Sequence, residues 1–417
     1  MYKKQTLKNG IRLITAPRQE TQTASLIVMV KVGSRYEIGR DSGLAHFIEH
    51  MMFKGTNKRP TTLALSKELD SVGAEYNAFT GKDVTAYFIK ADTRHLPLAI
   101  DLLSDMLLHS KMDGAEIEKE KGVIVEEINM YEDNPLMHTE EMLEEIMFAD
   151  NPLGHMIAGE RETVKAVKRN QMARFKNKYY QGKNIVIGLA GNFLPEQVQE
   201  IKRKFSFLPG QREKFAKFRV DQKAPRVGVK YKDTEQVQLA LGWPAYAYSD
   251  EKLYPLQLLS VILGGNMSSR LFINVREKKG LAYFVHSGVN VYEDAGSLVI
   301  QAGLDKSRID LAIKTILAET EKLKQAVSAA ELKRAKDFMA GKVALDLEDS
   351  LSIARWYAGQ EIMTKKIMTP QEKLSRLSRV TVQEVKQVAR EIFQKKKTSL
   401  AIIGPFKEEK KFKKLVG

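Results

Sequence analysis

Two histidines and a glutamate stand within five residues near the N-terminus, in the order His46-Phe47-Ile48-Glu49-His50. On a helix, His46 and His50 lie one turn apart on the same face, where both imidazoles can bind one metal ion. Glu49 lies between them on nearly the same side and can accept a proton from a water molecule at the metal. The spacing therefore predicts a metal-dependent hydrolase with Glu49 as its general base.

The residues around this motif predict the helix that the spacing requires. Asp41 or Ser42 can cap the N-terminus of the helix. Apolar residues recur at helical spacing and would seat the helix in a core: Leu44, Phe47, Ile48, Met51 and Met52. The alternative is a buried helix that carries two incidental histidines. Because the chain has only 7 His in 417 residues, the metal-binding interpretation is favoured.

A second helix, predicted over residues 113–131, carries two further acidic candidates. Glu120 and Glu127 are seven residues apart, so they share one face of this helix, two turns from each other. Such a pair of carboxylates can complete a metal site. The alternative is that this glutamate-rich helix is simply solvated.

The composition limits the classes of protein to consider. The hydrophobic and charged fractions of 43% and 29% are typical of a globular protein, and 417 residues favour two domains. Cys is absent, which excludes disulfides and thiolate zinc sites. We see no signal peptide and no apolar run of membrane-spanning length, so we expect a cytoplasmic protein without a membrane partner.

The formal net charge of +15 raises the alternative of a nucleic-acid-binding protein. The basic excess consists mainly of scattered lysines on predicted helices with little aromatic interleaving, and the segment 113–162 is strongly acidic. We therefore expect solvated helix faces and no nucleic-acid partner.

The order of predicted elements indicates an internal duplication. Gly191-Asn192-Phe193 and the helix after it recur 213 residues later as Gly404-Pro405-Phe406 and its helix. We therefore predict an α+β fold of two duplicated α/β-sandwich domains of similar topology, over residues 1–215 and 227–417 with a linker at 216–226. The His-x-x-Glu-His motif does not recur, so the metal site belongs to the N-terminal domain.

Four segments resemble the family that contains pitrilysin, insulin-degrading enzyme and mitochondrial processing peptidase, whose inverted zinc motif is the one at residues 46–50. The segments are Ser42–Thr56, Glu120–Asp133, Leu263–Phe272 and Arg276–Tyr283. The resemblance covers both halves of the chain and implies a two-domain fold of the predicted kind.

The resemblance implies roles for particular residues. His46 and His50 match the zinc-binding histidines and Glu49 the general base. Glu127 matches the third zinc ligand, with Glu126 as the rival, and Glu120 matches an active-site carboxylate behind the metal.

Other positions match the substrate-binding residues of the family. Arg276 and Tyr283 match a pair that reaches the substrate backbone from the second domain, and we expect one of them to act in catalysis by helping zinc to stabilise the tetrahedral oxyanion. Asn77 and Ala78 match the edge strand on which peptides lie, and the sequence independently predicts a hairpin there, over residues 73–89.

The expectation is a zinc metallo-endopeptidase, with one Zn²⁺ per chain, acting on an extended peptide substrate in a chamber between domains. A catalytically inactive structural or assembly subunit of the same family is the alternative. Because larger relatives use four such domains, we expect a homodimer, with a monomer as the other option.

Overall fold

The computed structural model describes residues 2–210 and 215–417 and divides into two compact units. Residues 211–214, at the end of the predicted N-terminal domain, lie outside the described residues. The first unit comprises residues 1–128, 155–216 and 344–368. The second unit comprises residues 129–154, 217–343 and 369–417.

The first unit is built on a six-stranded sheet. Its strands are β1 (Lys3–Thr6), β2 (Arg12–Pro17), β3 (Thr23–Val30), β4 (Glu75–Thr80), β5 (Thr85–Asp92) and β6 (Ile185–Gly191). They lie in the order β1-β2-β6-β3-β5-β4. Only β2 and β6 are parallel among the neighbouring strands. β4 ends the sheet and has one unpaired edge, and β4 with β5 forms the predicted hairpin.

The second unit repeats this topology with five strands. They are β7 (Arg226–Tyr231), β8 (Gln236–Ala245), β9 (Ala282–Val291), β10 (Gly296–Asp305) and β11 (Ser399–Gly404). Their order, β7-β11-β8-β10-β9, matches β2-β6-β3-β5-β4 strand for strand. The first pair is parallel in both sheets. The predicted α+β fold with two domains of similar topology is therefore confirmed.

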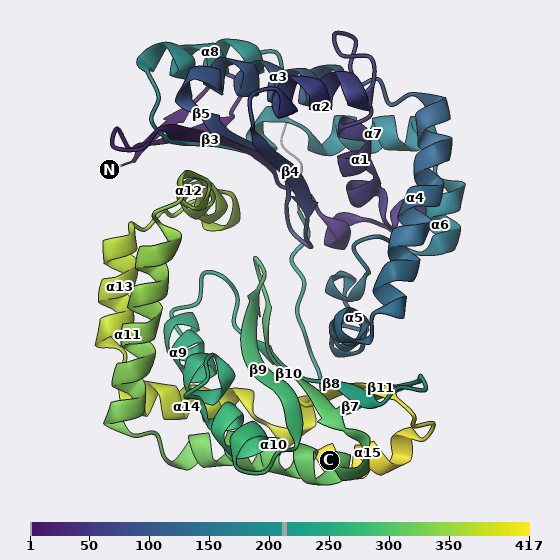
Figure 1. The fold of residues 1–417 in the computed structure, drawn as a ribbon, viewed down its shortest axis with the longest axis vertical. Helices are drawn as coiled ribbons and strands as arrows, with labels where there is room; N and C mark the ends of the chain where they lie inside the picture. Colours follow the sequence, from purple (N-terminus) through teal and green to yellow (C-terminus); the bar gives the residue numbers. More distant parts are fainter. Residues whose placement is uncertain (1, 211–214) are drawn as a thin grey trace. The chain divides into compact units, whose positions relative to one another are not determined.

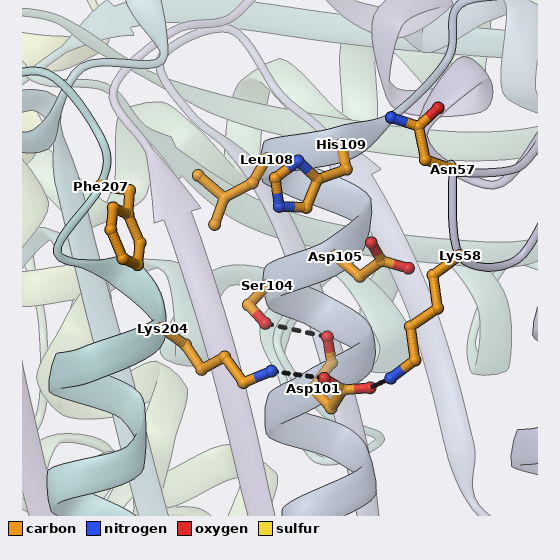
Figure 2. Close-up of a pocket in the computed structure, with 9 residues that line it drawn as sticks. All are labelled: Asn57, Lys58, Asp101, Ser104, Asp105, Leu108, His109, Lys204 and Phe207. Atoms are coloured by element: carbon orange, nitrogen blue, oxygen red, sulfur yellow. Dashed lines mark hydrogen bonds and ion pairs between the residues drawn. The ribbon is translucent and has the colours of Figure 1, made fainter.

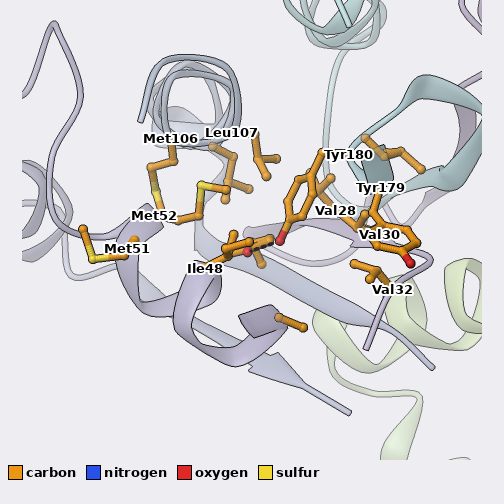
Figure 3. Close-up of a cluster of buried hydrophobic side chains, with 14 of the residues drawn as sticks. Val28, Val30, Val32, Ile48, Met51, Met52, Met106, Leu107, Tyr179 and Tyr180 are labelled. Atoms are coloured by element: carbon orange, nitrogen blue, oxygen red, sulfur yellow. Dashed lines mark hydrogen bonds between the residues drawn. The ribbon is translucent and has the colours of Figure 1, made fainter. Parts of the chain in front are cut away.

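Helices cover both faces of the first sheet (Figure 1). Those of the first unit are α1 (Leu44–Met52), α2 (Thr62–Asp70), α3 (Leu96–His109), α4 (Gly114–Asp133), α6 (Arg161–Ala166), α7 (Arg169–Tyr179), α8 (Pro195–Phe205) and α12 (Ser350–Thr364). The last residues of α4 belong to the second unit. One apolar core joins α1, α3 and α7 to one sheet face, and Figure 3 shows Met52 and Ile48 of α1 beside Met106 of α3 in this core. The core therefore holds the motif helix against the sheet.

The second unit has a similar set of helices. They are α5 (Pro135–Met147), α9 (Leu253–Gly264), α10 (Ile309–Gln325), α11 (Ala329–Asp346), α13 (Pro370–Arg379), α14 (Val382–Ile392) and α15 (Glu409–Val416). Helices α9, α10 and α14 share a core with one face of the second sheet. None of the helices in the described part of the chain combines the length and apolar character that a bilayer crossing requires.

Two helices lie in the opposite unit from their neighbours in the sequence. α12 packs on the first sheet, where Ile353, Tyr357 and Ile362 join Ile14 and Ile27 in a buried cluster. α5 packs on the second sheet in the same manner. Both helices occupy the same place in the duplicated element order, after α3-α4 and after α10-α11. The predicted limits 1–215 and 227–417 describe continuous halves, whereas each compact unit takes one segment from the other half.

Candidate metal centre

Three potential metal ligands converge where α1 and α4 meet. One ligand atom from each of His46, His50 and Glu127 lies within 4.8 Å of the other two. The Nε2 atoms of His46 and His50 are 3.2 Å apart. Glu127 places one carboxylate oxygen 3.6 Å from His46 Nε2 and the other 3.5 Å from His50 Nε2. Glu126, the rival ligand from the sequence, is exposed and is not part of this cluster.

The donor set and its spacing fit zinc. Tetrahedral zinc with bonds of about 2.0–2.1 Å to nitrogen and oxygen separates its ligand atoms by about 3.3 Å. The separation of 3.2 Å between the two Nε2 atoms lies close to that value, and each Nε2 has a different oxygen of Glu127 at a similar distance, 3.6 Å for His46 and 3.5 Å for His50. Two imidazoles and one carboxylate also leave one tetrahedral position open, which is the arrangement of catalytic rather than structural zinc sites.

Glu120 contacts the metal cluster from behind. Its Oε1 accepts a hydrogen bond of 2.8 Å from Nδ1 of His50, and its Oε2 lies 2.5 Å from Nζ of Lys54. A carboxylate on the second ring nitrogen fixes the orientation of a ligand histidine and makes Nε2 a better donor to a metal. Nδ1 of His46 is buried and has no hydrogen-bond partner among the described residues.

The two imidazoles differ in their affinity for protons. Burial, with the nearby charge of His50, lowers the pKa of His46 to about 4. Burial also lowers the pKa of His50, but its hydrogen bonds to Glu120 and Glu127 outweigh burial and raise the pKa to about 9. The carboxylates thus hold a positive charge beside His46, at the place where the ligand atoms converge.

Glu49 is buried next to this cluster and is held by the edge strand. The hydroxyl of Thr80 on β4 donates a hydrogen bond to Oε2 of Glu49. Burial raises the pKa of Glu49, and the charge of His50 opposes this shift. The carboxylate of Glu49 is therefore positioned by two elements, α1 and β4.

The start of α1 differs from the sequence prediction. Neither Asp41 nor Ser42 caps the helix, because the N-cap residue is Gly43, with φ of +84° and no side-chain cap of its own. The buried carboxylate of Glu37 accepts the N–H groups of Gly43 and Ala45, both at 2.7 Å. The cap therefore comes from a side chain six residues upstream, because the left-handed turn at Gly43 points these N–H groups toward it.

The predicted substrate strand is the edge of the first sheet. Asn77 and Ala78 lie in the middle of β4, with Asn77 exposed on one face and Ala78 partly buried on the other. Oδ1 of Asn77 accepts the N–H of Ala78 at 2.8 Å. A peptide that pairs with this edge would compete with the Asn77 side chain for that N–H.

Arg276 and Tyr283 lie in the second unit. Arg276 belongs to a π-helical turn, Phe272–Glu277, and Tyr283 to the edge strand β9. The Arg276 guanidinium lies 4.7 Å from the ring centroid of Phe272 and 6.0 Å from that of Tyr283. The Tyr283 side chain is 73% exposed, so its ring and hydroxyl are open to a ligand.

A cavity of about 500 Å³ lies elsewhere in the first unit, beside α3 and α8. Figure 2 shows Lys58 and Lys204 both directed at Asp101, and Asp105 further along the same helix. None of the predicted site residues lines this cavity. Lys58 and Lys204 already neutralise Asp101, the carboxylate at the centre of this cavity. The cavity is therefore not the metal centre.

The sequence alone did not point to three residues that support the candidate site: Glu37, which caps α1, Lys54, which pairs with Glu120, and Thr80, which donates to Glu49. Lys54 lies within the segment that resembles the family, so proximity to the motif could have identified it. The cap from Glu37 depends on the left-handed turn at Gly43, and Thr80 reaches Glu49 from the edge strand β4, and no spacing rule predicts either contact.

Comparisons with known proteins extend over almost the whole chain. Residues 12–161 match the family described as Insulinase (Peptidase family M16), and residues 166–339 match the Peptidase M16 inactive domain. The chain is 33% identical over 406 residues to the uncharacterized zinc protease YmxG of Bacillus subtilis, covering 97% of this chain and 98% of that protein. It is 34% identical to the uncharacterized zinc protease SCO5738 of Streptomyces coelicolor, covering 97% and 90%.

Solved structures show the same fold along almost the whole chain. A protease from Helicobacter pylori superposes with a TM-score of 0.90 at 25% identity, covering 97% of this chain and 99% of that one. A peptidase M16 inactive domain from Pseudomonas fluorescens superposes with a TM-score of 0.89 at 19% identity, covering 98% of both chains, which shows the fold alone. By its sequence, over almost its full length, this chain belongs to the M16, or insulinase, family of peptidases.

Proposed function

We propose that this chain is a zinc metallo-endopeptidase that hydrolyses peptides or unfolded segments bound in an extended form. The observation that carries this proposal is the convergence of the His46, His50 and Glu127 ligand atoms beside the buried carboxylate of Glu49. Two relatives are named as uncharacterized zinc proteases, which agrees with this proposal.

The proposed zinc would be held by Nε2 of His46, Nε2 of His50 and the Glu127 carboxylate. When bound, zinc supplies a Lewis acid that lowers the pKa of a water molecule and polarises the scissile carbonyl. Glu120 keeps the His50 ring oriented through its hydrogen bond to Nδ1. Lys54 balances the charge of Glu120 on the side away from the histidines.

Glu49 is the proposed general base. It accepts a proton from the attacking water and then delivers that proton to the leaving amine. The hydroxyl of Thr80 holds Oε2 of Glu49, which leaves Oε1 to carry the proton.

The substrate is proposed to add to the unpaired edge of β4 as an extra strand, along Asn77 and Ala78. This mode recognises the backbone of an extended peptide and therefore suits unfolded segments. Arg276 and Tyr283 are proposed as further contacts to the substrate backbone, and their cation–π contact holds the two side chains together.

The test compares two substitutions in the motif. Glu49→Gln should keep zinc and lose at least about a hundredfold in kcat on an unstructured fluorogenic peptide, because the ligands survive while the base does not. His50→Ala should lose both zinc and turnover. Zinc is measured by elemental analysis after gel filtration, and near-normal turnover by Glu49→Gln would refute the assignment.

The alternative is a catalytically inactive structural or assembly subunit. The match to an inactive domain covers residues 166–339, whereas the motif lies in the part that matches the peptidase family itself. Stoichiometric zinc without turnover of any unstructured peptide would favour the alternative.

We further propose a cytoplasmic homodimer that binds one zinc ion per chain. The basis for the homodimer is the family resemblance, since larger relatives use four such domains and this chain has two. Light scattering coupled to gel filtration gives the mass, and a monomer at micromolar concentration would contradict the dimer.

A further inference from the structure

One arginine extends from α12 across the outer strands of the first sheet. The helix itself packs on β2, β6 and β3. The guanidinium of Arg355 lies 4.7 Å from the ring centroid of Phe88 on β5 and 5.4 Å from that of Phe79 on β4. Because the sheet ends in the order β3-β5-β4, the Arg355 side chain reaches to the unpaired edge.

No carboxylate pairs with Arg355 among the described residues. Asp349 is the charged group that acts on it, but the two oxygens of Asp349 are bound by Nζ of Lys90 at 3.0 Å and by the N–H of Ser352 at 2.8 Å. Burial against the two rings lowers the pKa of Arg355. A guanidinium that stacks on aromatic faces keeps the N–H groups in its plane available for a ligand.

The faces of β4 separate this arginine from the metal centre. Thr80 and Ala78 lie on the α1 face, where Thr80 contacts Glu49. Phe79 and Asn77 lie on the opposite face, and Phe79 is 39% exposed. A peptide paired with β4 would lie about 4.8 Å from it, with every second side chain on the face of Phe79 and Arg355.

We propose that Arg355, supported by Phe79, forms a subsite for a carboxylate of the peptide substrate, near the cleaved bond. The proposal rests on the proposed function, in which β4 receives the substrate as an added strand. The carboxylate is that of an Asp or Glu side chain or of the peptide C-terminus, since both present the same planar pair of oxygens to a guanidinium.

The chemistry of the surface favours an anion over other side chains. Glu75, the acidic residue on this face of β4, is already paired with Lys90, and Asp349 is bound as described above. Among the described residues, the guanidinium is therefore a charged group of this surface that has no direct ion pair, whereas both carboxylates contact Lys90. A charge-assisted pair with a carboxylate fits it better than any neutral side chain.

The experiment uses the zinc-loaded full-length chain and matched peptides. Each peptide carries Glu, Gln or Lys at one position within three residues of the cleaved bond, and each is made with a free and an amidated C-terminus. At one position, or for the free C-terminus, the unmodified chain should show about tenfold higher kcat/KM for the carboxylate form. The position or terminus that shows this preference identifies the source of the carboxylate.

Substitution of Arg355 should change the preference and not only the rate. In Arg355→Gln, the kcat/KM for the Glu peptide should become nearly equal to that for the Gln peptide. In Arg355→Glu, the peptide that carries Lys at the same position should become the preferred substrate. Arg94→Gln is the matched control, because Arg94 lies in the same unit and already pairs with Asp92 at 3.0 Å. A reversal of preference cannot arise from partial unfolding, so it separates recognition from packing on the aromatic rings.

The outcomes separate this proposal from the proposed function. If both the unmodified chain and Arg355→Glu turn over the peptides, and the ratio of kcat/KM for the Glu peptide to that for the Gln peptide is the same in both, the subsite is overturned. The proposed peptidase activity would not be affected by that result. Absence of turnover on every peptide would overturn the peptidase. In that case fluorescence anisotropy of the same labelled peptides tests the subsite, and equal affinity of the unmodified chain for Glu and Gln forms would overturn it.

Discussion

Thr80 links the edge strand to the proposed base, because its hydroxyl donates to Glu49 while its backbone belongs to β4. Thr80→Val keeps the size of the side chain and removes this donor. We expect kcat to fall about tenfold with little change in KM, because the loss affects the orientation of Glu49 and not the strand edge. Steady-state kinetics on an unstructured peptide, with zinc content measured in parallel, checks this.

The conservative variant provides the control. Thr80→Ser retains a hydroxyl and should recover most of kcat. An equal loss in Thr80→Ser and Thr80→Val, or zinc loss in either, would show that Thr80 acts through packing.

Glu37 is a buried carboxylate whose burial raises its pKa to about 8, against the opposing effect of the N–H groups of Gly43 and Ala45. The charges of Asp41 and Lys82 also act on it, in opposite directions. The folded chain binds the proton of the Glu37 carboxyl more tightly than the unfolded chain does. The protonated Glu37 therefore stabilises the folded state, and this contribution to the free energy of unfolding is complete below about pH 4.5. It is lost as the pH rises to about 8, by at most about 1.4 kcal/mol per pH unit.

The measurement is the free energy of unfolding in urea between pH 5 and pH 9. Because other groups also titrate, the informative quantity is the difference between the unmodified chain and Glu37→Gln. We expect this difference to shift in favour of Glu37→Gln as the pH rises. A difference that does not depend on pH would contradict the raised pKa of Glu37.

At the scale of elements, the position of α1 depends on the turn that precedes it. Gly43 has φ of +84°, and a Cβ atom there would lie 2.5 Å from the carbonyl oxygen of Ala158. Gly43→Ala should therefore lower the free energy of unfolding by more than about 2 kcal/mol, because backbone strain adds to a clash with rigid backbone. It should also weaken zinc binding, since His46 lies one turn away.

A second glycine gives the comparison for Gly43. Gly341 lies within α11 and is exposed, and nothing lies within 4 Å of the place where its Cβ would be. Gly341→Ala should stabilise the chain by about 0.5–1 kcal/mol, because alanine favours the helix. Thermal unfolding of both variants checks the opposite signs, and a neutral Gly43→Ala would contradict the close approach to Ala158.

At the scale of the whole molecule, neither continuous half contains a complete unit. The outer face of the first sheet is covered by α12, which buries Ile353, Tyr357 and Ile362. Each such side chain contributes about 1.5–3 kcal/mol on burial, and a typical domain is stable by only about 5–15 kcal/mol. A fragment of residues 1–215 should therefore bind hydrophobic dyes and aggregate.

Restoring the missing segment tests this explanation. The same fragment with residues 344–368 joined through a flexible linker should bind less dye and unfold more cooperatively, although its α5, which packs on the second sheet in the full chain, stays uncovered. Gel filtration and urea unfolding give the answer. A soluble fragment 1–215 with a sharp unfolding transition would show that α12 is not required.

Much of the site could be predicted from the sequence. The separation of His46 and His50 by four residues, and of Glu120 and Glu127 by seven, fixes which side chains share a helix face, because the period of a helix is a local property. The 213-residue repeat predicted two domains of similar topology, because each copy contains the same order of locally predicted helices and strands. The family resemblance, together with the helix face that Glu127 shares with Glu120, then favoured Glu127 over Glu126.

The tertiary structure decided what depends on contacts between distant segments. Glu37 caps α1 in place of Asp41 or Ser42, Thr80 contacts Glu49, and Arg355 reaches Phe79 from a helix more than 250 residues away in the sequence. The packing of α5 on the second sheet and of α12 on the first also depends on contacts between distant segments. The sequence of an amphipathic helix shows which of its faces is buried, but it does not show which sheet covers that face. Local periodicity therefore determined the elements and the ligand faces, whereas packing decided what lies against them.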